Sequence, residues 1–134
     1  MRYRVEHFKP AEFLCPCCGR GGIAAFLAYS LDELRRAWNM PILVNSGWRC
    51  PDHNLEVGGS ANSRHKIGCA VDIRPTDEKL IGPFQTLVGY MFGRRDGWEL
   101  KLYPRFVHLA VPRDEEAHIW TGGLISGSFT CRKE

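Results

Sequence analysis

The segment Ser63-Arg64-His65-Lys66-Ile67-Gly68-Cys69-Ala70-Val71-Asp72 carries the strongest signal in this chain, because it sets a histidine and an aspartate seven residues apart. A further histidine, His108, lies in the apolar run of residues 106–111. Two imidazoles and one carboxylate form the three-ligand set of a catalytic zinc site, which leaves a fourth position open. Such a site implies hydrolytic chemistry. We therefore expect one Zn²⁺ ion, bound by His65, Asp72 and His108.

The apolar surroundings of Asp72 and His108 bear on this interpretation. Asp72 stands between Val71 and Ile73, and a carboxylate in a buried strand is costly unless a cation pairs with it. Zinc would supply that charge. Taken alone, His108 is better explained as an ordinary buried, hydrogen-bonded histidine, and it becomes the third ligand only together with the first segment. Alternation in its strand sends residues 106, 108 and 110 to one face and residues 107, 109 and 111 to the other.

Several spaced elements around the first segment extend the pattern. They are Ser46-Gly47-Trp48-Arg49-Cys50-Pro51-Asp52-His53-Asn54, Val57-Gly58-Gly59-Ser60-Ala61-Asn62-Ser63-Arg64-His65 and Gly68-Cys69-Ala70-Val71-Asp72-Ile73. Together they resemble the zinc D-Ala-D-Ala carboxypeptidase family, which includes D,D-dipeptidases, phage endolysins and the hedgehog-type zinc domain. The resemblance runs from about residue 8 to residue 111. It rests on the order of several motifs and not on one short match.

The resemblance implies a zinc metallopeptidase that cleaves peptidoglycan stem peptides, as a D,D-carboxypeptidase or as an endopeptidase of the endolysin kind. It places Arg49 beside the metal as a catalytic residue, where a planar and permanently charged guanidinium suits an oxyanion. It also gives Ser63 a substrate-binding role. On their own, Arg49 reads as a surface arginine and Ser63 as a residue that closes a turn. The peptide bond that is cut stays open.

The general base is where the chain departs from the family pattern. Relatives carry an acidic residue three positions before the last histidine or two positions after it, and here these positions are Arg105 and Ala110. The available substitutes are acidic residues of neighbouring segments: Glu99, Asp114, Glu115 and Glu116. We take Glu99 as the candidate catalytic base, because a hairpin turning at residues 104–105 would bring it near the region after His108. The strand register that this requires is not fixed by the sequence.

The missing acids keep a second function open, in which a non-catalytic zinc-binding domain of the same fold binds cell-wall peptide or a protein partner. A third interpretation is a cysteine-based zinc module for nucleic acid. The net charge of +3 disfavours it, because nucleic-acid binders carry a larger and more clustered positive charge.

The cysteines near the N-terminus raise the question of a second metal. Cys15-Pro16-Cys17-Cys18 contains a C-x-x-C spacing, which can bind zinc. A structural zinc site needs four ligands, and further ligands are available only if the fold brings them close: Cys50, Cys69, Cys131 and His7. We take reduced thiols packed under a loop as the simpler interpretation, and we do not count Cys69 as a ligand.

Length and composition predict a single domain spanning residues 1–134. Residues 1–7 lack the apolar core of a signal peptide, and no apolar run of about 18 residues is present. We therefore expect cytoplasmic synthesis, with action on the cell wall after release in the manner of a phage enzyme. The expected partner is a peptidoglycan stem peptide, with no nucleic acid and no membrane, and the expected oligomeric state is a monomer.

Hydrophobic periodicity predicts an α+β fold with a small, mainly antiparallel sheet and helices packed on one side. By resemblance this is the hedgehog/D-Ala-D-Ala-peptidase type of fold. The expected helices span residues 23–39 and 76–92, and residues 51–62 are expected to be a loop. The expected strands span residues 42–44, 69–73, 99–103 and 106–111, with an edge strand over residues 126–131.

Overall fold

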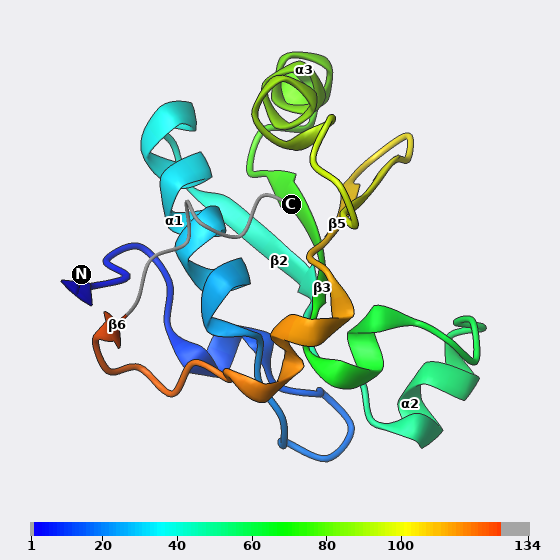
Figure 1. Ribbon diagram of the computed structural model, residues 1–134. Helices are drawn as coiled ribbons and strands as arrows, with labels where there is room; N and C mark the ends of the chain where they lie inside the picture. Colours follow the sequence, from blue (N-terminus) through cyan, green and yellow to red (C-terminus); the bar gives the residue numbers. More distant parts are fainter. Residues whose placement is uncertain (1, 127–134) are drawn as a thin grey trace.

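The computed structural model describes residues 2–126, which are arranged around one four-stranded antiparallel sheet (Figure 1). The strands of this sheet are β2 (Ile42–Ser46), β3 (Ala70–Pro75), β4 (Glu99–Leu102) and β5 (Val107–Ala110). Their order is β2-β3-β5-β4, so that β3 and β5 are the central strands. A separate two-stranded pairing joins β1 (Arg2–Tyr3) to β6 (Ile125–Ser126). The α+β prediction is confirmed.

Helices and short 3₁₀ turns complete the fold. The helices are α1 (Ala25–Trp38), α2 (Pro51–Glu56) and α3 (Ile81–Phe92). The 3₁₀ turns are η1 (Pro10–Phe13), η2 (Arg64–Ile67), η3 (Glu78–Leu80) and η4 (Arg113–Ala117). Figure 1 shows α2 well apart from α1 and α3, beyond the end of β2. In the described part of the chain, no helix is long and apolar enough to cross a membrane.

One face of the sheet forms the hydrophobic core with α1 and α3. In β5, Val107 and Leu109 are fully buried, as are Val71 and Ile73 in β3. The helices contribute buried apolar side chains to the same cluster: Leu27, Leu31, Leu34, Phe84 and Val88. The alternation predicted for residues 106–111 is therefore confirmed. It leaves the opposite face of β3 and β5 free for polar side chains.

The bounds of the two long helices follow from their end residues. Helix α1 ends at Trp38 and is capped by Asn39, which adopts a left-handed conformation with φ 59° and donates its N–H to the carbonyl of Arg35. The predicted helix over residues 76–92 is divided, because the side chain of Asp77 caps the separate turn η3. Pro83 then lies in the first turn of α3, where its missing N–H costs nothing.

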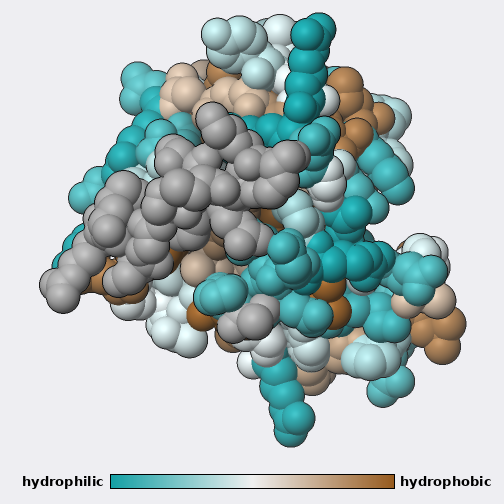
Figure 2. Space-filling model, in the orientation of Figure 1, coloured by the Kyte–Doolittle hydropathy of each residue, from teal (hydrophilic) through white to brown (hydrophobic). Residues whose placement is uncertain are grey.

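The loop predicted over residues 51–62 was wrong in its first half, which forms α2. Cys50 is the N-cap, and its sulfur accepts the backbone N–H of His53 at 3.4 Å. Pro51 occupies the first helical position, and Asp52 adds a negative charge near the positive end of the helix dipole. Figure 2 shows a mostly hydrophilic surface on this side of the molecule, with an apolar patch over α2 and the loop after it.

The edge strand expected over residues 126–131 is tested only at its first residue. Ser126 pairs with Arg2 in the two-stranded sheet and does not join the main sheet. Residues 127–131 lie outside the described part of the chain.

A buried carboxylate holds the N-terminal segment against α1. Asp32 is fully buried and accepts the backbone N–H groups of His7 at 2.9 Å and Glu6 at 3.2 Å. The hydroxyl of Tyr3 donates to the same carboxylate at 2.9 Å. Burial raises the pKa of Asp32, but the backbone donors of His7 and Glu6 outweigh it, and the net shift is downward. The ionised carboxylate is therefore a fixed part of the fold.

We expect Asp32→Asn to lower the free energy of unfolding by about 2–3 kcal/mol, because one acceptor oxygen becomes an amide donor that faces the backbone N–H groups. Urea denaturation measures the change. The matched control is Glu33→Gln, the next residue of the same helix, whose side chain is 40% exposed. It should change stability by no more than about 0.5 kcal/mol. An equal effect of both substitutions would contradict a special role for Asp32.

Candidate metal centre

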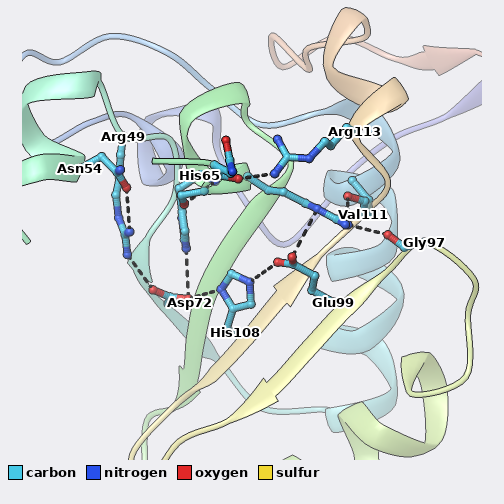
Figure 3. A network of polar contacts seen from close by, with 12 residues as sticks. Arg49, Asn54, His65, Asp72, Gly97, Glu99, His108, Val111 and Arg113 are labelled. Carbon is cyan, nitrogen blue, oxygen red and sulfur yellow. Dashed lines mark hydrogen bonds and ion pairs between the residues drawn. The ribbon is translucent and has the colours of Figure 1, made fainter. Parts of the chain in front are cut away.

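The three predicted metal ligands meet on the polar face of the sheet (Figure 3). His65 comes from η2, Asp72 from β3 and His108 from β5. Asp72 and His108 are direct partners in the register of β3 and β5, so the sheet itself brings two ligands together. His65 is 2% exposed and Asp72 is 7% exposed. The ligand atoms of all three lie within 4.8 Å of one another.

The spacing of these atoms suits a zinc ion. Asp72 Oδ1 lies 3.2 Å from His65 Nε2 and 3.0 Å from His108 Nδ1. Zinc bound to nitrogen and oxygen at about 2.0–2.1 Å in tetrahedral geometry separates neighbouring ligand atoms by about 3.3 Å. Two imidazole nitrogens and one carboxylate oxygen are also a set that zinc prefers. The donor atoms present therefore fit the ion.

Each histidine is oriented by its other ring nitrogen. His65 Nδ1 donates to the carbonyl of Gly47 at 2.8 Å, which leaves Nε2 for the metal. His108 Nε2 lies 2.9 Å from Glu99 Oε1, which leaves Nδ1 for the metal. Such outer partners set the ring orientation and the basicity of the ligand nitrogen. The ring tautomers follow from these contacts.

Hydrogen bonds between the ligands shift the pKa values of both His108 and Asp72. Burial alone would lower the pKa of His108, but its hydrogen bonds to Asp72 and Glu99 raise it above the usual value. Burial would raise the pKa of Asp72, but its hydrogen bonds to His108 and His65 hold it far below the usual range. Zinc binds histidine only through a deprotonated ring nitrogen, so zinc binding at this centre would compete with protonation of His108.

Glu99 reaches the centre from β4. In the register of β4 and β5 it is paired with Ala110, and its carboxylate points at the His108 ring (Figure 3). Its second oxygen lies 3.5 Å from Arg64 Nε. Burial raises the pKa of Glu99, but the hydrogen bond to His108 and the nearby positive charges give a net lowering. The carboxylate is therefore ionised and in direct contact with a metal ligand. Its role as general base stays a prediction.

Arg49 follows β2 and is fixed by three side chains, of which Figure 3 labels Asn54 and Asp72. Its Nη2 lies 3.1 Å from Asp72 Oδ2, its Nε donates to Ser46 Oγ at 3.0 Å, and its Nη1 donates to Asn54 Oδ1 at 3.2 Å. Asn54 is itself buried and donates to the carbonyl of Ser60 at 2.9 Å. The sequence does not predict the contact between Asn54 and Arg49, because that contact depends on the unpredicted helix α2.

Ser63 lies in the turn that carries His65, and the acidic residues considered as alternative bases lie in η4. Ser63 is the N-cap of η2, and its hydroxyl accepts the backbone N–H of His65 at 3.2 Å. It therefore closes the turn that positions a ligand, and contact with substrate stays a prediction. Glu115 and Glu116 lie near Cys69. Burial, with the charges of Glu116 and Glu115, raises the pKa of the Cys69 thiol to about 12.

Comparison with protein families agrees with this geometry. The family model described as peptidase M15 matches residues 6–110, which include all three ligand positions. The chain belongs to the peptidase M15 family. A search of curated proteins finds no match to it. Members of the M15 family are zinc peptidases, so membership supports a zinc-dependent hydrolase. The resemblance inferred from the sequence motifs is confirmed.

We expect His65→Ala and His108→Ala to reduce the zinc content of this M15 family member by one ion per chain, because each removes one of three protein ligands. Elemental analysis of the purified proteins measures this. His53→Ala is the matched control, since His53 lies in α2, where its ring nitrogen is 3.8 Å from Glu56. Equal zinc content in the wild type and both ligand variants would contradict the assignment.

Proposed function

We propose that this chain is a zinc-dependent peptidase that hydrolyses peptide bonds in the stem peptides of peptidoglycan. The observation that carries the proposal is the buried set of His65, Asp72 and His108 beside a fixed arginine, Arg49. Zinc bound there would act as a Lewis acid on the scissile carbonyl and would lower the pKa of water in the open position. Membership in the peptidase M15 family supports the same class of reaction.

Arg49 supplies positive charge for the oxygen of the scissile carbonyl. A guanidinium has five N–H donors, and Ser46, Asn54 and Asp72 each take one of them. The remaining donors can bind a developing oxyanion. Because the three contacts fix the group in advance, little reorganisation is needed in the transition state. The backbone N–H of Arg49 donates to the carbonyl of His65 at 3.0 Å, so Arg49 is also held directly against a metal ligand.

Glu99 is our proposed proton acceptor. Its carboxylate is ionised, contacts His108 and comes from the strand position opposite Ala110. Position 110 is one of the two sites where relatives carry an acid. In the resting arrangement Glu99 also holds the His108 ring, so it would have to exchange that contact for the proton of the attacking water. A purely positioning role is the alternative, and the two roles make different kinetic predictions.

A groove on the same face of the sheet supports a peptide substrate. Its volume is about 720 Å³, and its lining includes Arg74, Tyr103, Arg105 and Phe106. Arg74 lies two residues after Asp72, so strand alternation puts its side chain on the same face. The lining also includes Glu78, and none of the three metal ligands belongs to it. Its cationic and aromatic groups suit the carboxylates and the backbone of a stem peptide, and we propose the groove as a subsite for the substrate chain beyond the bond that is cut.

The second candidate function is a zinc domain that binds cell-wall peptide without cleaving it. The observation that favours it is the loss of an acid at both family positions, Arg105 and Ala110. Purified peptidoglycan separates the two functions. Release of new amino or carboxyl termini supports the peptidase, whereas zinc-dependent binding without release supports the binding domain.

We expect Arg49→Ala to lower the rate of peptide release from peptidoglycan by about 10²–10³-fold, because one oxyanion donor is lost. Zinc content should stay unchanged, since Arg49 contacts a ligand but is not one. Arg49→Lys, which keeps the charge but loses the planar donors, should be intermediate. Arg94→Ala, at an exposed arginine, is the control. Wild-type rates in Arg49→Ala would rule out this role.

Glu99→Gln distinguishes the two roles of that carboxylate. As the proton acceptor, its loss should lower kcat by about 10²–10⁴-fold while zinc is retained. As a positioning group alone, its loss should weaken zinc affinity by about 10–100-fold, and excess zinc should restore the rate. Chelator competition and rates at saturating zinc separate these results. Glu116→Gln, at an exposed glutamate, should behave as wild type.

A further inference from the structure

A second group of potential metal ligands lies outside the site described above. Cys15, Cys17 and Cys18 follow η1, and Cys50 directly precedes α2. Their four sulfur atoms all lie within 4.8 Å of one another. The sequence favours reduced thiols, because it does not show a fourth ligand close to the first three cysteines. The structure corrects this interpretation, since Cys50 lies beside the loop of residues 15–18 and supplies the fourth sulfur.

The other ligands considered from the sequence are engaged elsewhere or lie outside the described chain. His7 contacts Asp32 through Nδ1 at 3.1 Å. The Cys69 thiol lies 3.9 Å from the carbonyl of Ile67. Cys131 is outside the described residues. Within residues 2–126, the group therefore consists of the four cysteines.

The sulfur separations match a metal site and not a disulfide. The Sγ atoms of Cys15 and Cys17 are 3.5 Å apart, those of Cys15 and Cys50 are 3.7 Å apart, and those of Cys17 and Cys50 are 3.2 Å apart. A disulfide joins its sulfurs at about 2.05 Å. Tetrahedral zinc with Zn–S bonds of about 2.3 Å separates neighbouring sulfurs by about 3.8 Å. The three separations, 3.2–3.7 Å, lie at or somewhat below that edge length and well above a disulfide bond.

The backbone around the cysteines forms tight turns that face the sulfur atoms. The N–H of His53 donates to Cys50 Sγ at 3.4 Å, and a hydrogen bond from a backbone N–H is stronger to an anionic sulfur than to a neutral one. The turn closes where Gly19, at φ 69°, donates its N–H to the carbonyl of Cys15 at 2.7 Å. The loop is thus folded back on itself around the sulfur atoms.

We propose that Cys15, Cys17, Cys18 and Cys50 bind a second Zn²⁺ ion in a four-thiolate site. Because the protein fills all four positions, such a site is structural and takes no part in hydrolysis. It stands independently of the proposed peptidase activity. Its ligands connect the N-terminal segment to the residue that follows Arg49 in the chain.

Packing around the cluster indicates what the ion would hold in place. The N–H of Trp48 donates to the carbonyl of Phe13 at 2.8 Å, and a Cβ on Gly47 would meet the backbone of Phe13 at 2.6 Å. The N-terminal segment therefore lies directly against the turn that carries Arg49. A zinc ion would hold this contact in place through its coordinate bond to Cys50. Loss of the ion would loosen both the turn that carries Arg49 and the N-cap of α2.

Zinc analysis of matched variants tests the proposal. Wild type should contain two zinc ions per chain, and the double variant His65→Ala/His108→Ala should retain one. X-ray absorption of that double variant should show four sulfur neighbours at about 2.3 Å. Cys15→Ser/Cys50→Ser should lose one ion, and the control Cys69→Ala should lose none. Iron in place of zinc, or nitrogen and oxygen neighbours around the retained ion, would overturn the assignment.

A measurement on the unmodified chain covers the case in which the cysteine variants do not fold. Titration of wild-type protein with an organomercurial should release one zinc ion as the thiolates react, and the released ion is detected with a chromogenic chelator. The second ion should remain until a strong chelator is added. If all zinc survives complete thiol modification, or if mass spectrometry of the native protein finds a disulfide among these four residues, the proposal fails.

Discussion

The carboxylate of Asp72 is the group on which the arrangement of this molecule depends. It lies on a central strand with neighbours on both sides, and it is almost completely buried. A buried carboxylate is stable only if positive or donor groups surround it. One oxygen meets His65 and His108, and the other meets Arg49. Side chains from three separate parts of the chain, His65, His108 and Arg49, thus surround the one negative charge of Asp72 on β3.

The sheet explains why so much of the centre could be predicted from sequence. The bounds of the strands follow from local apolar runs, and alternation then fixes the face of Asp72 and His108. The position of Glu99 depends in addition on the register of β4 and β5, which the sequence leaves open and the structure supplies. The local pattern therefore predicts the face on which each side chain lies but not which residues are paired across strands.

The features that could not be predicted depend on contacts between distant segments. Helix α2 is too short to show hydrophobic periodicity, and it forms because Cys50 caps it and Asn54 is held by Arg49. Cys50 is 35 residues from Cys15, and no spacing rule connects them. The buried Asp32 likewise looks in sequence like one more polar helix residue, because its partners lie in the N-terminal segment.

The pairing of Glu99 with Ala110 has a consequence for how relatives are compared. Two residues opposite each other on adjacent strands have Cβ atoms about 5 Å apart, although they stand far apart along the chain. If Glu99 acts as the base, an acid on one strand can take the role of an acid on the neighbouring strand. A comparison made column by column along β5 would count such chains as inactive. Comparison by position on the sheet would group them with their acidic relatives.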